Sequence, residues 1–185
     1  MATKKRTKDE WIAAAVEALA EGGVDAVRVE RLARTLGVTK GSFYWHFTDR
    51  GTLLSTLVQG WEAGGTQDVI AQVDALGGDA RARMRRLWEV TQGDRGLAAE
   101  LALRDWARRD PEVAARVQRV DDARMGYVRA LFVEMHPDAD DIEARAMLLY
   151  SLLIGNYFIR ARHGRRGRPR VLSEAIELLM AAQPS

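Results

Sequence analysis

The chain is a series of helical stretches separated by glycine and proline, and this pattern is the feature that most constrains its fold. Between the breaks, apolar residues recur three and four positions apart, and no stretch shows the alternation and β-branched enrichment of a strand. We therefore predict an all-α fold of about nine helices. The expected helices cover residues 8–21, 29–36, 40–47, 49–75, 79–92, 97–108, 111–135, 142–162 and 171–182.

The predicted breaks have specific residues. Gly22-Gly23 ends the first helix, and Asp49, Asp79 and Asp110 stand where caps are needed. The glycines at 60, 64 and 65 lie inside the expected helix 49–75, where we expect them to allow a kink.

The composition excludes several classes of protein. The 185 residues include no cysteine, which removes thiolate metal sites, cysteine nucleophiles and disulfide scaffolds and fits a cytoplasmic location. The charged opening continues into Asp9 and Glu10 without an apolar run, so we expect no export signal. The longest apolar run, Met147 to Ile159, is shorter than the roughly 20 residues of a membrane span, and we expect no membrane partner.

The basic residues are unevenly distributed. The net charge is only +2, but all four lysines lie within the first 40 residues, at positions 4, 5, 8 and 40. A GC-rich genome accounts for the excess of arginine elsewhere but not for this clustering. The lysines give modest support to a nucleic-acid partner for the N-terminal end.

Residues 29–47 have the pattern of a helix-turn-helix. Leu32 and Leu36 are one turn apart, Ala33 is small where a second helix crosses, Gly37 forms the turn and Val38 fills the space between the helices. Two short helices meeting at a tight corner are therefore expected.

The second helix of such a pair usually enters the major groove with its N-terminal residues at the base edges. Here it opens with Thr39, which can cap it, followed by Lys40, Gly41 and Ser42, which are short or flexible and rich in donors. We expect Phe43 and Phe47 to point into the core. The neighbouring side chains expected to face outwards and donate to phosphates are Tyr44, Trp45 and His46.

This segment resembles the tetracycline-repressor (TetR) family of bacterial regulators. The shared pattern consists of Leu32-Ala33, Leu36-Gly37-Val38-Thr39, Gly41-Ser42-Phe43-Tyr44, His46-Phe47, Arg50 and Leu53. The resemblance implies phosphate contacts from Thr39, Tyr44, His46 and Arg50, and places Lys40, Ser42 and Trp45 nearest the bases. Gly41 lets the helix start approach the DNA backbone. Arg28 and Gly51 depart from the pattern. Arg28 replaces a capping Ser or Thr, and we expect it to make a longer, charge-assisted phosphate contact.

The resemblance further implies two domains. Residues 1–50 would form a three-helix DNA-binding module, and residues 51–185 a helical domain for ligand binding and dimerisation. Helix 142–162 is apolar around most of its circumference, and Ser151 and Gly155 permit close helix approach. We therefore expect a homodimer formed by helices 142–162 and 171–182, the alternative being a core helix buried within one chain.

Large side chains with polar tips are candidates for a ligand pocket in the second domain, although core packing explains each one singly. They are Trp88, Trp106, Tyr127, Tyr150 and Asn156. The expected ligand is a small apolar or aromatic molecule. The basic loop 163–170 is interpreted as a solvated connector in preference to a nucleic-acid contact.

The sequence therefore predicts a DNA-binding transcriptional regulator, a repressor released from a palindromic operator by a small apolar ligand. It is not expected to be an enzyme, since its three histidines are isolated and no catalytic or nucleotide-binding motif occurs, and we expect no cofactor or metal. One alternative is a helical ligand-binding protein with a TetR-like head that no longer regulates DNA. A second is a nucleoid-type protein that binds any duplex.

Overall fold

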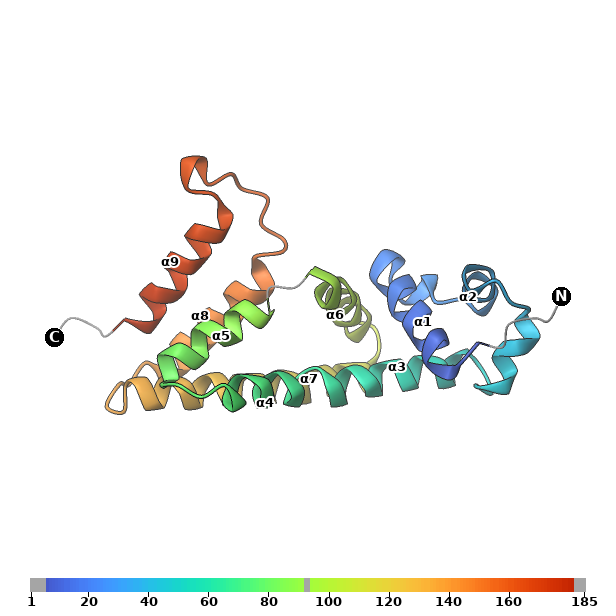
Figure 1. The fold of residues 1–185 in the computed structure, drawn as a ribbon, viewed down its shortest axis with the longest axis horizontal. Helices are drawn as coiled ribbons and strands as arrows, with labels where there is room; N and C mark the ends of the chain where they lie inside the picture. Colours follow the sequence, from blue (N-terminus) through green and yellow to red (C-terminus); the bar gives the residue numbers. More distant parts are fainter. Residues whose placement is uncertain (1–5, 92–93, 182–185) are drawn as a thin grey trace. The chain divides into compact units, whose positions relative to one another are not determined.

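A computed structural model describes residues 6–91 and 94–181, with backbone only for residues 94–96, and in this part of the chain all regular secondary structure is helical (Figure 1). Lys4, Lys5 and the predicted end of the last helix at Ala182 lie outside these residues. The described residues form nine α-helices and three 3-10 helices, so the all-α prediction is confirmed. The α-helices are α1 Lys8–Gly22, α2 Val29–Leu36, α3 Arg50–Gly64, α4 Gln67–Ala75, α5 Ala80–Thr91, α6 Asp94–Ala107, α7 Pro111–Met135, α8 Ile142–Gly155 and α9 Arg168–Met180; the 3-10 helices are η1 Val24–Ala26, η2 Lys40–Trp45 and η3 Gly164–Arg166.

The predicted caps at three helix starts are confirmed. The Asp49 carboxylate accepts the Thr52 amide at 2.7 Å, and the Asp79 carboxylate accepts the Ala82 amide at 2.7 Å. Asp110 accepts two amides at the start of α7, where Pro111 supplies a preset φ and lacks the N–H that would have no partner.

The expected helix 49–75 is divided in two. α3 ends at Gly64 and α4 begins at Gln67, so the glycine pair ends a helix where only a kink was predicted. Two adjacent glycines weaken a helix because each has high backbone entropy and contributes no packing side chain. Thr66 lies buried at the break.

The expected helix 142–162 was also too long, because α8 ends at Gly155. The Gly155 carbonyl accepts the amides of both Phe158 and Ile159, and the Arg168 guanidinium donates to the carbonyls of Asn156 (2.5 Å) and Ile159. An arginine from the following helix thus takes acceptors that a longer helix would have used. α9 begins at Arg168, earlier than predicted, after Gly167 with φ 70°.

The chain forms two compact units, each built from two segments. The first unit comprises residues 1–67 and 92–120. In it α6 packs against α1, and Leu103 of α6 joins the buried core of the N-terminal helices (Figure 1). The largest fully buried side chains of this core are Trp11, Leu19, Leu32, Phe43 and Leu53. The predicted boundary at residue 50 separates two functions, whereas the two units are separated by compactness. The functional boundary stays a prediction.

The second unit comprises residues 68–91 and 121–185, with a core that includes Met84, Phe132 and Met180. α8 and α9 run antiparallel in it, because Arg145 near the start of α8 donates to carbonyls at the end of α9, while Arg168 at the start of α9 donates to Asn156 at the end of α8. Across residues 6–91 and 94–181, no helix is both long enough and apolar enough to cross a membrane.

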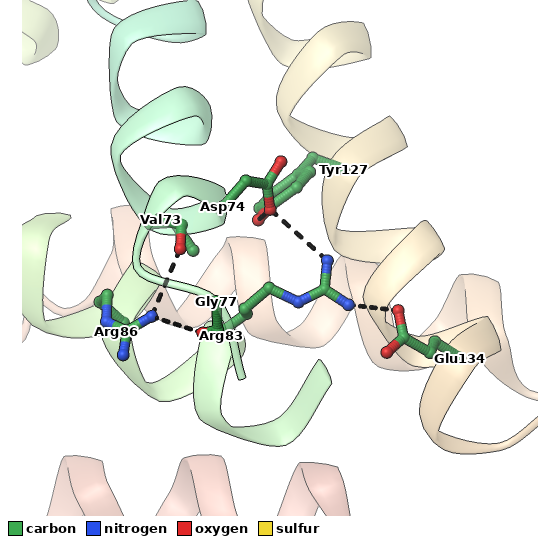
Figure 2. Close-up of polar contacts among 7 residues, drawn as sticks. All are labelled: Val73, Asp74, Gly77, Arg83, Arg86, Tyr127 and Glu134. Atoms are coloured by element: carbon green, nitrogen blue, oxygen red, sulfur yellow. Dashed lines mark hydrogen bonds and ion pairs between the residues drawn. The ribbon is translucent and has the colours of Figure 1, made fainter. Parts of the chain in front are cut away.

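Polar contacts fix the turn between α4 and α5 in this unit. Arg86 donates to the carbonyls of Val73 and Gly77, while Arg83 bridges Asp74 and Glu134 (Figure 2). The Tyr127 hydroxyl donates to Asp74 at 2.6 Å. Burial, followed by this hydrogen bond, raises the pKa of Tyr127 to about 12. These bonds join α4, α5 and α7.

Candidate nucleic-acid interface

The corner between α2 and η2 has the geometry that the sequence predicts. Gly37 adopts the left-handed conformation (φ 67°, ψ 35°), which costs a residue without a side chain least. The Val38 amide donates to the Ala33 carbonyl at 3.0 Å and the Gly37 amide to the Arg34 carbonyl at 3.2 Å, ending α2. Leu32 and Ala33 are buried beneath the corner, and Val38 packs against the same core. The predicted helix-turn-helix is confirmed.

The second helix of the pair is a short 3-10 helix, where an α-helix over residues 40–47 was expected. Its inward face is aromatic: Phe43 and Phe47 are buried, and Phe43 lies edge-on to Trp11 with ring centroids 5.3 Å apart. The prediction that both phenylalanines belong to the core is confirmed. They hold the segment onto α1.

The outward face of this segment carries two large aromatic side chains. Tyr44 is 55% exposed and Trp45 is 79% exposed, as predicted. Gly41 is also exposed, and a Cβ there would meet only the Thr39 hydroxyl at 3.8 Å, an ordinary contact. Packing within the chain therefore does not require glycine at this position, which is consistent with a requirement for space outside it.

Lys40 pairs with Glu30 of α2 across the corner. The hydrogen bond between them lowers the pKa of Glu30 and raises the pKa of Lys40, so both groups stay charged over a wide range of pH. Because both side chains lie in water, the lysine can exchange this partner for a nucleic-acid acceptor at little cost.

Thr39 occupies the N-cap position of η2, but its side chain makes no capping bond, so the predicted cap was wrong. The short 3-10 turn is closed instead through the Thr39 carbonyl, which accepts both the Ser42 amide at 3.1 Å and the Ser42 hydroxyl at 2.9 Å. The Thr39 side chain is exposed.

Three side chains predicted to contact phosphate also make hydrogen bonds within the helix-turn-helix head, by which we mean residues 6–53. The Arg50 guanidinium donates to the carbonyls of Val27 (2.6 Å) and Val24 (2.5 Å), and His46 Nε2 lies 2.8 Å from the Arg6 carbonyl. Arg28 at the N-cap of α2 makes no side-chain cap, and its Nε donates to the Asp25 carbonyl at 2.9 Å. Each of these three side chains therefore has a partner within the head.

An anchor at the start of the chain was not predicted. Arg6 donates to the Leu36 carbonyl at 2.9 Å and pairs with Glu10 at 2.6 Å. Thr7 and Glu10 form a reciprocal capping box at the start of α1, with the Glu10 amide donating to the Thr7 hydroxyl and the Thr7 amide to the Glu10 carboxylate. The Thr-x-x-Glu spacing was the signal that would have revealed it.

The five predicted ligand residues lie in both units. Trp106 packs against the core of the first unit, whereas Trp88, Tyr127 and Tyr150 pack against the core of the second. The Tyr150 hydroxyl donates to Asp121 at 2.6 Å, and the Asn156 side chain accepts from Arg168 at 3.0 Å. The structure thus brings three of the aromatic residues to one core, and the ligand role of all five stays a prediction.

Comparison with known proteins agrees with this geometry. Residues 12–57 match the family described as bacterial regulatory proteins, tetR family. An uncharacterized HTH-type transcriptional regulator, TtgW of Pseudomonas putida, is 35% identical over 57 residues, which cover 31% of this chain and 42% of that protein. The chain thus matches less than half the length of this curated relative.

Solved structures match along nearly the whole chain. A regulator from Saccharomonospora viridis in complex with choline has a TM-score of 0.77 at 16% identity and covers 94% of each chain. A bacterial regulatory protein of the tetR family from Rhodococcus has a TM-score of 0.69 at 21% identity, also covering 94% of each chain. A TetR-family regulator from Bordetella parapertussis has a TM-score of 0.68 at 15% identity, with 93% of each chain covered. At these identities the likeness shows the fold.

The fold and the corner together define an all-helical protein with an N-terminal helix-turn-helix. Its N-terminal segment and its fold are those of the TetR family of transcriptional regulators. Proteins of this family are DNA-binding regulators and not enzymes, in agreement with the sequence analysis.

Proposed function

We propose that this protein is a cytoplasmic, sequence-specific regulator that binds a palindromic operator as a homodimer. The observation that carries the proposal is the opposed orientation of side chains in residues 40–47. Phe43 and Phe47 fix the segment to the core, while Lys40, Tyr44 and Trp45 are exposed on it. A short segment anchored in this way and lined with donors suits insertion into the major groove.

The residues have distinct proposed roles. Lys40, Ser42 and Trp45 lie nearest the bases, Gly41 allows close approach, and Thr39 and Tyr44 donate to phosphates. For Arg28, His46 and Arg50 the proposed phosphate contacts come in addition to their bonds within the head. Arg50 retains donors for this purpose, since a guanidinium carries five N–H groups and two atoms of this one are engaged.

We propose that the dimer forms through α8 and α9. Met147 and Leu148 on α8 are 58% and 57% exposed, and Leu178 on α9 is 76% exposed. Large exposed apolar side chains on two helices of one unit are typical of a protein interface. Leu152 of α8, in contrast, packs against the core of its own unit, so a charge there would also disturb folding. Leu148→Glu is therefore a sharper test of the dimer than Leu152→Glu. It should produce monomers at micromolar concentration in sedimentation, with Ser173→Glu on α9 as an exposed polar control.

The proposed mode of control is release of a repressor by a small, mainly apolar effector bound in the C-terminal domain. Support comes from the aromatic side chains Trp88, Tyr127 and Tyr150 at the second core. A structural neighbour holds choline, a small quaternary ammonium ion of a kind that aromatic side chains also bind. Effector and operator would oppose each other's binding by the same coupling free energy, typically about 1–3 kcal/mol. Thermal-shift screening of apolar, aromatic and small cationic metabolites, followed by operator binding with each hit, tests this step. Hits that leave operator affinity unchanged would contradict it.

Selection from random DNA duplexes tests the DNA-binding proposal itself. A two-fold dimer presents two copies of residues 40–45, so the enriched sites should be inverted repeats with half-sites about one helical turn (~34–36 Å) or a multiple of it apart. Binding without an enriched motif would favour a nucleoid-type protein, and absence of binding would favour a ligand-binding protein with a degenerate head.

A further inference from the structure

Unpaired charges of opposite sign lie at the two ends of α8. The loop before the helix carries Asp138 and Asp140, which are exposed and take part in no ion pair within the described part of the chain. The segment after it carries Arg160, Arg162 and Arg165, which are also exposed and likewise without an ion pair among the described residues. We call these the acidic loop (residues 138–140) and the basic loop (residues 160–165).

The acidic and basic loops of one chain are too far apart to attract each other appreciably. α8 contains 14 residues, which at about 1.5 Å per residue separates its ends by roughly 20 Å. The Debye length is about 8 Å at physiological salt, so the loops of one chain barely attract each other. Any partner for either loop must therefore be brought to it by another contact.

The face of α8 between the loops provides that contact. Its exposed residues Ala144, Met147, Leu148 and Ser151 recur at helical spacing, and Leu178 is an exposed apolar side chain on the neighbouring helix α9. Gly155 adds an open position, since a Cβ there would meet nothing within 4 Å. This face has bulky side chains towards its N-terminal end and free space towards its C-terminal end.

A second copy of the chain fits this pattern in one orientation. If two α8 helices cross antiparallel about Ser151, Met147 and Leu148 of each subunit lie opposite Gly155 of the other. The large side chains of one helix then face the position without a side chain on the other helix. The same operation brings each acidic loop beside the basic loop of the other subunit, twice in the dimer, as an isologous interface requires. A parallel arrangement would place acid beside acid and base beside base.

We propose that the acidic and basic loops form a reciprocal electrostatic clasp between subunits that fixes the antiparallel register of the two α8 helices. The clasp rests on the proposed dimer and adds to it the residues that select the orientation. Residues 163–165 of this loop belong to the segment 163–170, which was interpreted from the sequence as a solvated connector, and this part of it then has a protein partner. Such charges contribute specificity and association rate as well as affinity.

Charge reversal tests the clasp. The acidic-loop variant Asp138→Arg/Asp140→Arg and the basic-loop variant Arg160→Glu/Arg162→Glu should each weaken dimerisation about tenfold or more in low salt, because attraction becomes repulsion at both contacts. Both losses should shrink at 0.5 M salt, and combining all four changes in one chain should restore the wild-type dissociation constant. Asp68→Arg/Glu89→Arg, which changes the charge by the same amount at exposed positions of the same unit, is the matched control and should change little. Sedimentation of the full chain measures all of these.

The possible failures are distinguishable. If wild-type protein is dimeric and both reversals dimerise equally well in low salt, the clasp is wrong and the dimer stands. If the four-fold variant stays as weak as either reversal, the loops do not face each other. If wild-type protein is monomeric at micromolar concentration, the proposed dimer itself is wrong.

Discussion

The helix-turn-helix head and the second unit both use basic side chains to satisfy backbone carbonyls, but the bonds differ in reach. In the head, Arg50 binds the carbonyls of Val24 and Val27, about two dozen residues away. In the second unit, Arg81 binds the carbonyl of Met180, 99 residues away, and Arg145 closes the end of α9. The longest such bond in the head joins His46 to the Arg6 carbonyl over 40 residues, whereas the longest in the second unit spans 99 residues because that unit is built from two segments far apart in the chain.

The two regions also differ in what they expose. The head exposes Tyr44 and Trp45, aromatic side chains that carry a polar donor, whereas the second unit exposes the aliphatic Met147, Leu148 and Leu178. An aromatic ring with a donor can face water or a phosphate, but an aliphatic cluster gains free energy only against another apolar surface. This difference is consistent with the DNA contact proposed for the head and with the dimer proposed for the second unit.

The largest expected effect separates two adjacent residues of the head. Phe43→Ala should destabilise the head by about 3–5 kcal/mol, because Phe43 is fully buried, and should abolish DNA binding. Tyr44→Ala should change stability by no more than about 0.5 kcal/mol while still weakening DNA binding. Urea unfolding followed by circular dichroism gives both values. Equal destabilisation by the two variants would show that the inner and outer faces are wrongly assigned.

The sequence predicted the turn and the core of the head better than the helix ends of the second unit. The turn at Gly37, the buried Phe43 and the capping Asp49 each follow from residues a few positions apart. The end of α8 at Gly155 depends on Arg168, and the end of α9 depends on Arg145, neither of which a local pattern reveals. Within the site, exposure of Trp45 was predictable because so short a helix cannot bury all its faces, but the internal partners of His46 and Arg50 were not.

The next largest effect tests the long-range bonds. Arg145→Met should destabilise the second unit by about 1–3 kcal/mol, because it removes a buried guanidinium that donates to the carbonyls of Leu179 and Ala181. Arg129→Met, which breaks an exposed pair with Glu143, is the matched control and should cost less. Similar small losses for both would argue against a structural role for the α9 end.

Substitution of Arg50 tests whether one residue both stabilises the head and contacts DNA phosphate. Arg50→Ala should destabilise the head by about 1–2 kcal/mol through the lost carbonyl bonds. It should also weaken binding to all DNA sequences about equally and reduce the salt dependence by roughly one ion. Affinity measured at several salt concentrations separates the two roles. If the salt dependence of DNA affinity is unchanged, Arg50 does not contact phosphate and serves only to bind the carbonyls of Val24 and Val27.

Ionisation of Tyr127 should make the stability of the second unit depend on pH in the alkaline range. Because its pKa in the folded protein is raised to about 12, its contribution to stability is full below the ordinary tyrosine value near 10 and is lost as pH rises from there towards 12. Tyr127→Phe should lose about 1 kcal/mol at neutral pH with the bond to Asp74, and should show a smaller further loss above pH 10. Parallel alkaline slopes for variant and wild type would contradict this.

The smallest expected effect is a gain in stability. Gly60 lies inside α3, and a Cβ there would meet nothing within 4 Å, so Gly60→Ala should stabilise the first unit by about 0.5–1 kcal/mol. Gly37→Ala, placed at a positive φ, should have the opposite sign. Thermal unfolding of the pair shows whether α3 tolerates a stiffer backbone. A loss of stability in Gly60→Ala would indicate a contact on this face that the single chain does not contain.

The central claim is that residues 40–45 read DNA while Phe43 and Phe47 hold them in place. Repeating the random-duplex selection with Lys40→Ala beside wild-type protein tests it most directly. Both proteins should select inverted repeats, with altered base preference confined to the same position of each half-site in the variant and an unchanged unfolding free energy. An identical motif bound with identical affinity would contradict the assignment of this segment as the reading surface.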